Sequence, residues 1–433
     1  MLMPILLSAC VLVAQAQTAP EALGPEVRRL VRQLYSPQLA QRQDAEEKLL
    51  GLGPAALDLL PPVGEQTPAE VQQRIGRVRQ KLQQAAVAST ARPSLITLKA
   101  EAMPLPEVLA ALAQQSGNKI VDFRPQFGQE VPKTEPPLKV DFQNTPFWEA
   151  LDRVLDDAGL TVYGFGEPQA ISLVQRPEGQ VSRSAGAAYS GPFRFEPIRV
   201  VAQRDLLRPQ SDSLLLGLNV SWEPRLKPIS LRQKMDELKA TDENDNPLAI
   251  AGRQAEIEVP AGEGTAVDLS IPLALPPRSV GQIASLKGQL AALLPGKIET
   301  FRFDHLVEAR NGELAGAKNV EKRIAGVTVT LDQVRKNNEL WEIRVRVRFD
   351  QAGQALESHR GWIFNNEAYL EDAQGKPIPY DSLETTMQAE NEVGVAYLFV
   401  LERPPTDCTF VYKTPGAIMA TRFEYEIRGV KLP

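Results

Sequence analysis

An internal repeat in residues 95–174 constrains the fold of this chain more than any other feature. Residues 96–121, moved forward by 42 positions (138 − 96), align with residues 138–163 without a gap. Each half begins with alternating apolar residues and continues with apolar residues three and four positions apart, between a proline and a glycine. These spacings indicate a half-buried strand and an amphipathic helix. The two halves therefore predict strand–helix–strand twice, as one small sheet with both helices on one face.

The same segment resembles a known module. Residues 96–117 and 138–163 resemble the short N-terminal domain of secretins and TonB-dependent receptors, mostly in the spacing of their apolar residues. The resemblance implies a periplasmic α/β module, here 93–176, that docks protein partners and has no catalytic residues. No sequence typical of the membrane-embedded pores of these families follows, so their transport functions are not expected.

The length and charge of the whole chain limit the number of domains and the class of partner that can be expected. A chain of 433 residues predicts roughly three domains. The net charge is −6, with acidic and basic residues spread along the chain. Nucleic acid is therefore not expected as a partner, because phosphate binding needs a concentrated basic surface.

The first 16 residues predict an export signal. Residues 4–14 are mostly apolar and lead into an A-x-A-type cleavage site at 14–16. The run is shorter than the roughly 20 apolar residues that span a bilayer. Residues 7–10 also resemble a bacterial lipobox, so a lipid on Cys10 is an alternative to simple export, and a buried N-terminal helix is a third. We expect an exported protein of the periplasm or cell envelope, peripheral to the membrane at most.

Residues 21–90 predict helices. Residues 42–60 resemble one HEAT-type helical unit, and a stripe of apolar residues follows within 71–82 at helical spacing. One apolar face is expected from Leu39, Ala45, Leu49 and Leu50. Because a single unit of this type cannot bury its own faces, we expect this segment to pack on the rest of the chain or on a partner.

Short strands dominate the remainder of the chain. A linker rich in Gly, Ser and Ala is predicted at 177–190. Beyond it, residues 214–222, 341–349 and 423–427 alternate between apolar and polar. We expect two antiparallel β-sandwiches, at 191–279 and 280–433. The fold class is thus multidomain α+β, with N-terminal helices, a β-α-β repeat module and two β-sandwich domains.

An acidic run is the candidate metal site. Asp242, Asn244, Asp245 and Asn246 supply the carboxylate and amide oxygens that calcium prefers, and the run matches the calcium-binding linkers of cadherin repeats. The other acidic motifs of a cadherin site are missing from the sequence. A polar hairpin turn is the alternative, and the parallel run at 372–377, which has the composition of a turn, favours it.

A stripe of arginines is the candidate binding surface. Arg344, Arg346 and Arg348 alternate with apolar residues, so they share one face of a strand. Such a stripe can hold an anionic polymer or lipid headgroups, and a solvated face is the alternative. His305 and His359 are the only histidines, Cys408 has no histidine near it in sequence, and no nucleophile-elbow or phosphate-loop motif occurs.

These observations predict a non-enzymatic, exported cell-envelope protein that acts as a protein-interaction or scaffolding adaptor. No cofactor and no catalytic residue are expected, and the sequence does not identify the envelope partner. One alternative is an extracellular module that binds glycan or another anionic surface through the arginine stripe or exposed aromatic side chains. Another alternative is a hydrolase.

Overall fold

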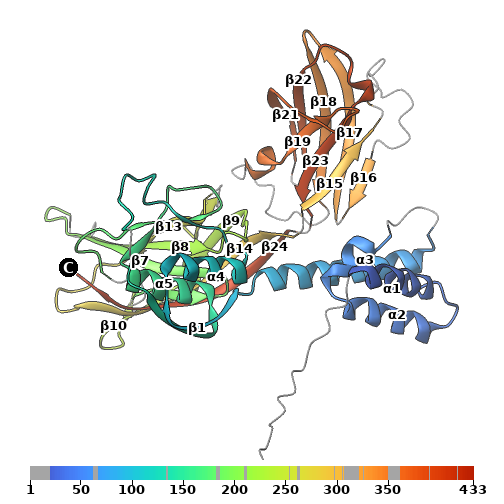
Figure 1. Cartoon of the computed structure of the whole chain (residues 1–433). Helices are drawn as coiled ribbons and strands as arrows, with labels where there is room; N and C mark the ends of the chain where they lie inside the picture. The colour runs from blue at the N-terminus through green and yellow to red at the C-terminus, as the bar shows by residue number, and fades with distance from the viewer. Residues whose placement is uncertain are drawn as a thin grey trace, which may run out of the picture. The chain divides into compact units, whose positions relative to one another are not determined.

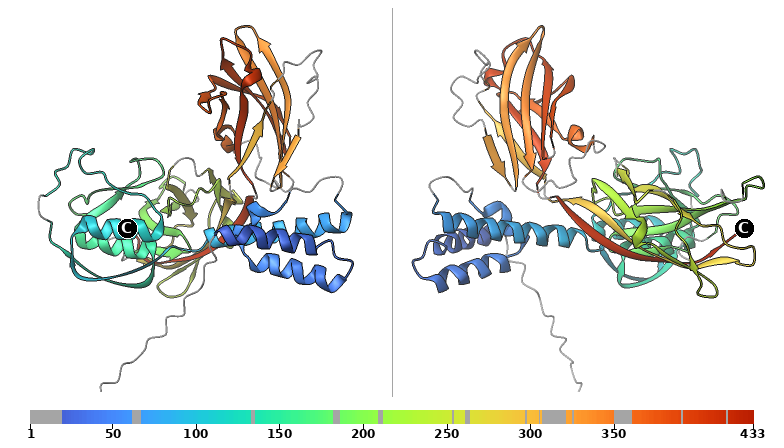
Figure 2. Two further views of the ribbon diagram at one scale, coloured as in Figure 1. Left: turned by 45° about the vertical axis from the view of Figure 1, so that its right-hand side comes forward. Right: turned by 180° about the vertical axis from the view of Figure 1, so that it is seen from behind.

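The structure is a computed structural model (Figures 1 and 2). It describes residues 20–61, 67–132, 135–181, 186–208, 212–252, 254–260, 264–296, 298–304, 306, 321–324, 326–349, 361–389, 391–416 and 418–433. The predicted export signal, with Cys10, and both histidines lie outside the described residues. The chain forms two compact units, 1–85 and 86–433. It is a mixed α+β protein, as predicted, with N-terminal helices, a small β-α-β module and several antiparallel sheets.

The N-terminal helices have a core of their own. They are α1 (Pro20–Gln33), α2 (Leu39–Gly51), the 3-10 helix η1 (Pro54–Leu59) and α3 (Ala69–Thr90). The buried apolar residues lie in these four helices or directly after them: Val27, Leu30, Val31, Leu34, Ala45, Leu49, Ala56, Leu60, Val71, Ile75, Val78 and Leu82. The segment therefore buries apolar faces internally, because α1 adds a further helix to the HEAT-like stretch. Packing of the segment on the rest of the chain or on a partner stays a prediction. Leu39, expected on the buried face, is 53% exposed.

The repeat at 95–174 folds as predicted into two strand–helix–strand halves. The first contains β1 (Leu95–Met103), α4 (Leu105–Ser116) and β2 (Ile120–Asp122), and the second contains β3 (Leu138–Pro146), α5 (Phe147–Ala158) and β4 (Leu160–Tyr163). The left-handed residues Gly117 and Gly159 end the two helices, a conformation that glycine adopts without a steric penalty.

The predicted single sheet is wrong, because this module contains two sheets. β1 pairs antiparallel with β3, whereas β5 (Ile171–Gln175), which lies outside the two aligned halves of the repeat, pairs with both β2 and β4. Both helices contact strands of both sheets, so the helices do not cover one face of a common sheet. One core joins the helices and sheets, and it includes Ile96, Leu112, Phe142, Leu151, Leu160 and Leu173.

The first sandwich consists of two sheets around Trp222, which is 1% exposed. One sheet has the order β13-β8-β7-β6, and the other has the order β11-β10-β14-β9-β12, with β24 paired to β14. The strands of the first sheet are β6 (Ala188–Ser190), β7 (Phe193–Gln203), β8 (Ser213–Trp222) and β13 (Ala266–Leu273). Those of the second are β9 (Ser230–Lys234), β10 (Lys239–Asp242), β11 (Pro247–Leu248), β12 (Glu256–Pro260), β14 (Gln282–Pro295) and β24 (Ile418–Lys431). The linker predicted at 177–190 ends earlier than expected, because residues 188–190 form β6.

The last strand of the chain belongs to this first sandwich, so a divide at residue 280 does not separate the two sandwiches. β24 pairs with β14 from Gln282↔Lys431 to Pro295↔Ile418, and it lies along the first sandwich as the long red strand in Figure 2. Its Phe423 and Tyr425 rings contact Phe193 and Phe195 of β7, with centroids 4.6 and 4.3 Å apart. The first sandwich is therefore interrupted, and the second is inserted between β14 and β24.

The second sandwich also has two sheets, ordered β15-β23-β19-β20 and β16-β17-β18-β22-β21. The first sheet contains β15 (Ile298–Phe303), β19 (Ala368–Glu371), β20 (Pro377–Pro379) and β23 (Thr409–Pro415). The second contains β16 (Glu321–Ile324), β17 (Val327–Asn337), β18 (Leu340–Phe349), β21 (Ser382–Gln388) and β22 (Glu392–Val400). The alternation predicted at 341–349 is confirmed, because β18 buries every second side chain in the core of this sandwich.

Two buried carboxylates hold the α/β module against the first sandwich. Asp152 of α5 is fully buried and accepts hydrogen bonds from Arg194 Nε of β7 (2.6 Å) and from the Tyr189 hydroxyl (2.8 Å). Burial and the Asp152 carboxylate together raise the pKa of Tyr189. Glu223, which follows β8 and is also fully buried, accepts hydrogen bonds from Ser94, Asn118 and Arg225. Buried charges are tolerated only when paired in this way, so these two contacts fix where the module sits on the sandwich.

Candidate docking site

Four aromatic side chains meet at the surface of the α/β module, where β2 and β4 end. The ring centroid of Tyr163 lies 5.8 Å from Phe123, 4.9 Å from Phe127 and 6.0 Å from Phe165. Phe165 is 89% exposed and Phe127 is 49% exposed. These four residues are called the aromatic cluster. Contiguous apolar surface of this kind marks interaction sites in soluble domains.

A buried arginine holds the loop that carries Phe123 and Phe127. Arg124 is 2% exposed, and it donates hydrogen bonds to both carboxylate oxygens of Asp122, at 2.9 and 2.7 Å. It also pairs with Glu135. Within the loop, the Phe127 amide donates to the Phe123 carbonyl (2.9 Å). The rings therefore project from a fixed backbone, so less conformational entropy is lost when a ligand binds.

A glycine holds the second loop, which carries Phe165. A Cβ atom at Gly166 would lie 2.1 Å from Ser172 Oγ, far inside van der Waals contact, so only glycine fits there. Ser172 is 1% exposed, and its hydroxyl accepts a hydrogen bond from the Glu167 amide (2.9 Å). Phe165 is thus held at the surface by the close approach of its loop to β5.

The rings of the aromatic cluster do not form a flat platform. Tyr163 is inclined by 59° to Phe127 and by 65° to Phe165, although it is nearly parallel to Phe123, at 21°. A sugar ring stacks on a flat aromatic face, whereas inclined rings leave recesses between them that side chains of a protein can fill. The cluster therefore presents inclined rings rather than one flat aromatic face.

Acidification is expected to loosen this loop. The Arg124 hydrogen bond outweighs burial and holds the pKa of Asp122 below its usual range. The ion pair therefore stabilises the folded loop fully above the unfolded pKa of about 3.9, and this contribution is lost as the pH falls through the lower folded pKa. We expect the Phe127 and Gln129 amides to keep their hydrogen-exchange protection down to about pH 4 and to lose it below.

The control for this pH effect is Asp122→Asn, which should remove the pH step at the loop. Amides of the second sandwich, such as that of Val345, report any general unfolding. Protection at Phe127 that persists unchanged to about pH 2, far below the usual carboxyl pKa, would contradict the role given to Asp122.

The acidic run at 242–246 is a hairpin turn between β10 and β11. Asp242 Oδ1 accepts hydrogen bonds from the amides of Asn244 (2.8 Å) and Asn246 (2.9 Å), and Oδ2 accepts from the Asn246 side chain (3.0 Å). Asp245 has a left-handed backbone, with φ of 61°. Asp372 accepts equivalent bonds from Gln374 and Lys376 in the turn between β19 and β20. This is the geometry of a polar hairpin turn, in which both carboxylate oxygens of Asp242 accept hydrogen bonds from residues of the turn.

In the described part of the chain, no three or more His, Cys, Asp or Glu side chains are grouped to hold a metal ion. Cys408 packs half-buried against the core of the second sandwich, and burial raises the pKa of its thiol. Trp148, Trp222 and Trp341 are buried, so they do not form an exposed stacking surface.

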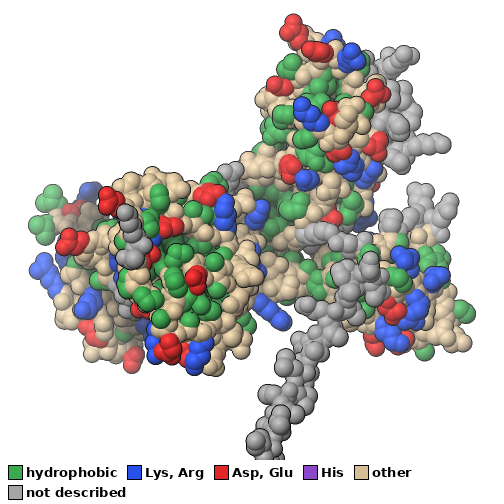
Figure 3. Space-filling model, in the orientation of Figure 1, with side chains coloured by type: hydrophobic (Ala, Val, Ile, Leu, Met, Phe, Trp, Pro, Cys, Tyr) green, Lys and Arg blue, Asp and Glu red, His purple; other side chains and the backbone are tan. Residues whose placement is uncertain are grey.

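The arginine stripe lies on β18, where described acidic side chains pair with Arg344 and Arg346. Arg346 pairs with Asp332 (2.7 Å) and Glu392 (3.5 Å), and Arg344 pairs with Glu342. Arg348 is exposed. Basic and acidic side chains are likewise interspersed over the surfaces visible in Figure 3. The stripe therefore carries much less positive potential than three free arginines.

Sequence reasoning missed the aromatic cluster, although the repeat contains its signal. Carrying the offset of 42 two residues further places Phe123 on Phe165 (123 + 42 = 165), so the cluster joins equivalent positions of the two halves. Both residues follow the second strand of their half, and β5 brings these two strands into one sheet.

No family model, no curated protein and no solved structure matches this chain. Among the helices that the structure describes, none is long and apolar enough to cross a membrane.

Proposed function

We propose that this chain is a non-enzymatic adaptor of the cell envelope that docks a protein partner through the aromatic cluster. The observation that carries the proposal is the exposure of Phe127 and Phe165 on two loops whose backbones are fixed by Arg124 and Gly166. Export is expected from the first 16 residues. The resemblance of the module to secretin-type domains, which dock protein partners, agrees with this role.

Exposed aromatic rings favour binding because they offer large apolar area with few rotatable bonds. Hot spots of protein interfaces are enriched in such residues and are commonly surrounded by polar groups. The exposed Lys119–Glu167 ion pair lies next to the cluster. The cluster therefore combines an apolar centre with polar neighbours, as an interface core and its rim do.

The proposal can be tested by placing a photo-activated benzophenone side chain at position 165 and irradiating cells that export the protein. We expect one discrete cross-linked protein from position 165. The matched control is position 400, because Val400 is an apolar residue of the second sandwich that is 64% exposed. It should give no such adduct. Equal adducts at both positions, or none at position 165, would count against docking through the cluster.

A further inference from the structure

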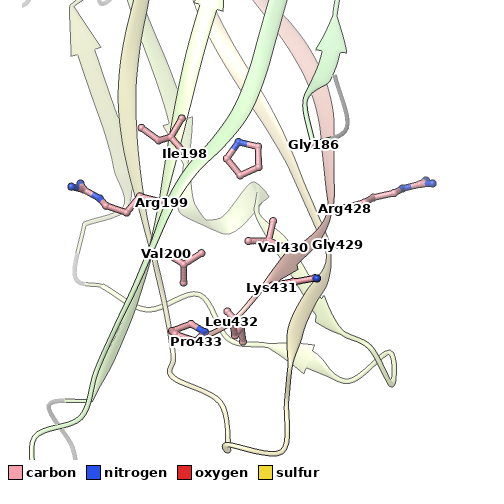
Figure 4. A pocket seen from close by; sticks show the side chains of 11 residues that line it. Gly186, Ile198, Arg199, Val200, Arg428, Gly429, Val430, Lys431, Leu432 and Pro433 are labelled. Carbon is pink, nitrogen blue, oxygen red and sulfur yellow. The ribbon is translucent and has the colours of Figure 1, made fainter. Parts of the chain in front are cut away.

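A second surface, separate from the aromatic cluster, lies on the first sandwich. A groove of about 490 Å³ opens between β7 and the end of β24 (Figure 4). Its lining includes the apolar side chains of Pro197, Val200 and Val430. The side chains of Arg199 and Arg428 point outward on opposite sides of the groove, and Lys431 lies near the chain end (Figure 4).

Unpaired strand edges border this groove. β6 pairs with β7 only at Phe193–Phe195, whereas β8 pairs with β7 up to Gln203. β24 pairs with β14 alone. Within the described strands, residues 196–203 of β7 and the outer side of β24 therefore lack a neighbouring strand. Such an edge presents backbone donors and acceptors that a further strand can use.

Exposed apolar side chains distinguish the edge of β7. Ile198 is 46% exposed and Val201 is 44% exposed, both on the unpaired part of this strand. Pro197 cannot donate a backbone hydrogen bond, so pairing is expected beyond it, at 199–203. On β24, the left-handed Gly429 interrupts the corresponding stretch. The β7 edge is therefore the better template for an added strand.

The charges of the groove select the ligand. Arg199, Arg428 and Lys431 are exposed, and the residues that line the groove include no aspartate or glutamate. Arg428 pairs with Glu426 (2.8 Å) but is 75% exposed, so it stays accessible to a second carboxylate. An extended peptide with alternating acidic and apolar residues complements both the cations and the apolar lining.

We propose that this groove binds an extended acidic peptide strand of a partner protein, which pairs with β7 at 199–203 while its carboxylates contact Arg199, Arg428 and Lys431. Two types of contact then act together. Backbone hydrogen bonds supply affinity, and the cations supply selection for an acidic sequence.

The test measures binding of fluorescent peptides of about nine residues to the full chain, with Asp or Glu alternating with apolar residues. We expect the Arg199→Glu/Lys431→Glu variant to bind acidic peptides at least about tenfold more weakly. N-methylation of the peptide backbone should cause a similar loss, because it removes the donors that pair with β7. Both substituted residues are exposed, so the melting temperature should not change.

Several outcomes would overturn this proposal. They are equal binding of peptides with Lys in place of the acids, binding that survives N-methylation, competition by inorganic phosphate as effective as by peptide, and a failure of every acidic peptide to bind. Concentration-dependent dimerisation that the same variant abolishes would indicate a second copy as occupant instead. Phe165→Ala should leave peptide binding unchanged, which separates this groove from the aromatic cluster.

Discussion

Replacing Arg194 by alanine is expected to lower the free energy of unfolding of the 86–433 unit by about 3–5 kcal/mol. The substitution removes the guanidinium that pairs with Asp152 at 2.6 Å, and Asp152 has no exposed surface. An unpaired charge then remains between α5 and β7, in a place that water does not reach. Removing one partner of a buried ion pair strongly destabilises a protein, because the other charge stays buried without a partner. Replacing both partners by apolar residues changes the stability much less.

Chemical denaturation followed by Trp fluorescence measures this loss. Arg153→Ala is a matched control, because Arg153 is the next residue of α5 and pairs with Glu149 at the surface. It should cost no more than about 0.5 kcal/mol. The double variant Asp152→Asn/Arg194→Met should recover part of the stability. If Arg194→Ala cost no more than Arg153→Ala, the pair would not hold the module in place.

Glu223→Ala is expected to be similarly costly, at about 3–5 kcal/mol. Glu223 accepts hydrogen bonds from the Ser94 amide (2.9 Å) and hydroxyl (2.6 Å), from Asn118 (2.9 Å) and from Arg225 (2.7 Å). Alanine leaves all four donors without this acceptor. Because Ser94 and Asn118 belong to the α/β module and Glu223 follows β8, the loss should weaken the attachment of the module to the sandwich and leave the Asp152–Arg194 pair as the remaining buried contact.

Hydrogen exchange distinguishes this local release from general destabilisation. Amides of the α/β module, such as that of Leu98, should exchange through an opening of much lower free energy. Amides of the second sandwich should keep their protection and so provide an internal control. In the Glu223→Gln variant, which retains one acceptor oxygen, the protection of the module amides should lie between that of the wild type and that of Glu223→Ala. Uniform loss of protection across both regions would contradict the separate anchoring of the module.

Local sequence patterns predicted where the strands and helices lie, but not which strands pair with one another. The alternation in β8, β18 and β24 follows from burial of one face, which a short window of sequence records. The pairing of β14 with β24 depends on residues separated by an entire inserted sandwich. The sequence of neither strand indicates that its pairing partner lies so far away along the chain. The split of the α/β module into two sheets depends in the same way on β5, which belongs to neither aligned half of the repeat.

The candidate sites show the same limit. The arginine stripe was visible as a period of two, but Asp332, which engages Arg346, comes from the neighbouring strand β17. The aromatic cluster joins two loops that only the sheet containing β2, β5 and β4 brings together. The groove beside β7 depends on which strand edges stay unpaired, a property of the complete sheet order.

The most direct test of the proposed function is the affinity of the protein that cross-links at position 165 for the Phe127→Ala/Phe165→Ala variant. Both rings are substantially exposed, so the variant should keep the wild-type melting temperature. We expect binding to weaken by at least about 2 kcal/mol, or roughly 30-fold, while Val400→Ala binds as the wild type does. Wild-type affinity in the folded double variant would contradict docking through the aromatic cluster.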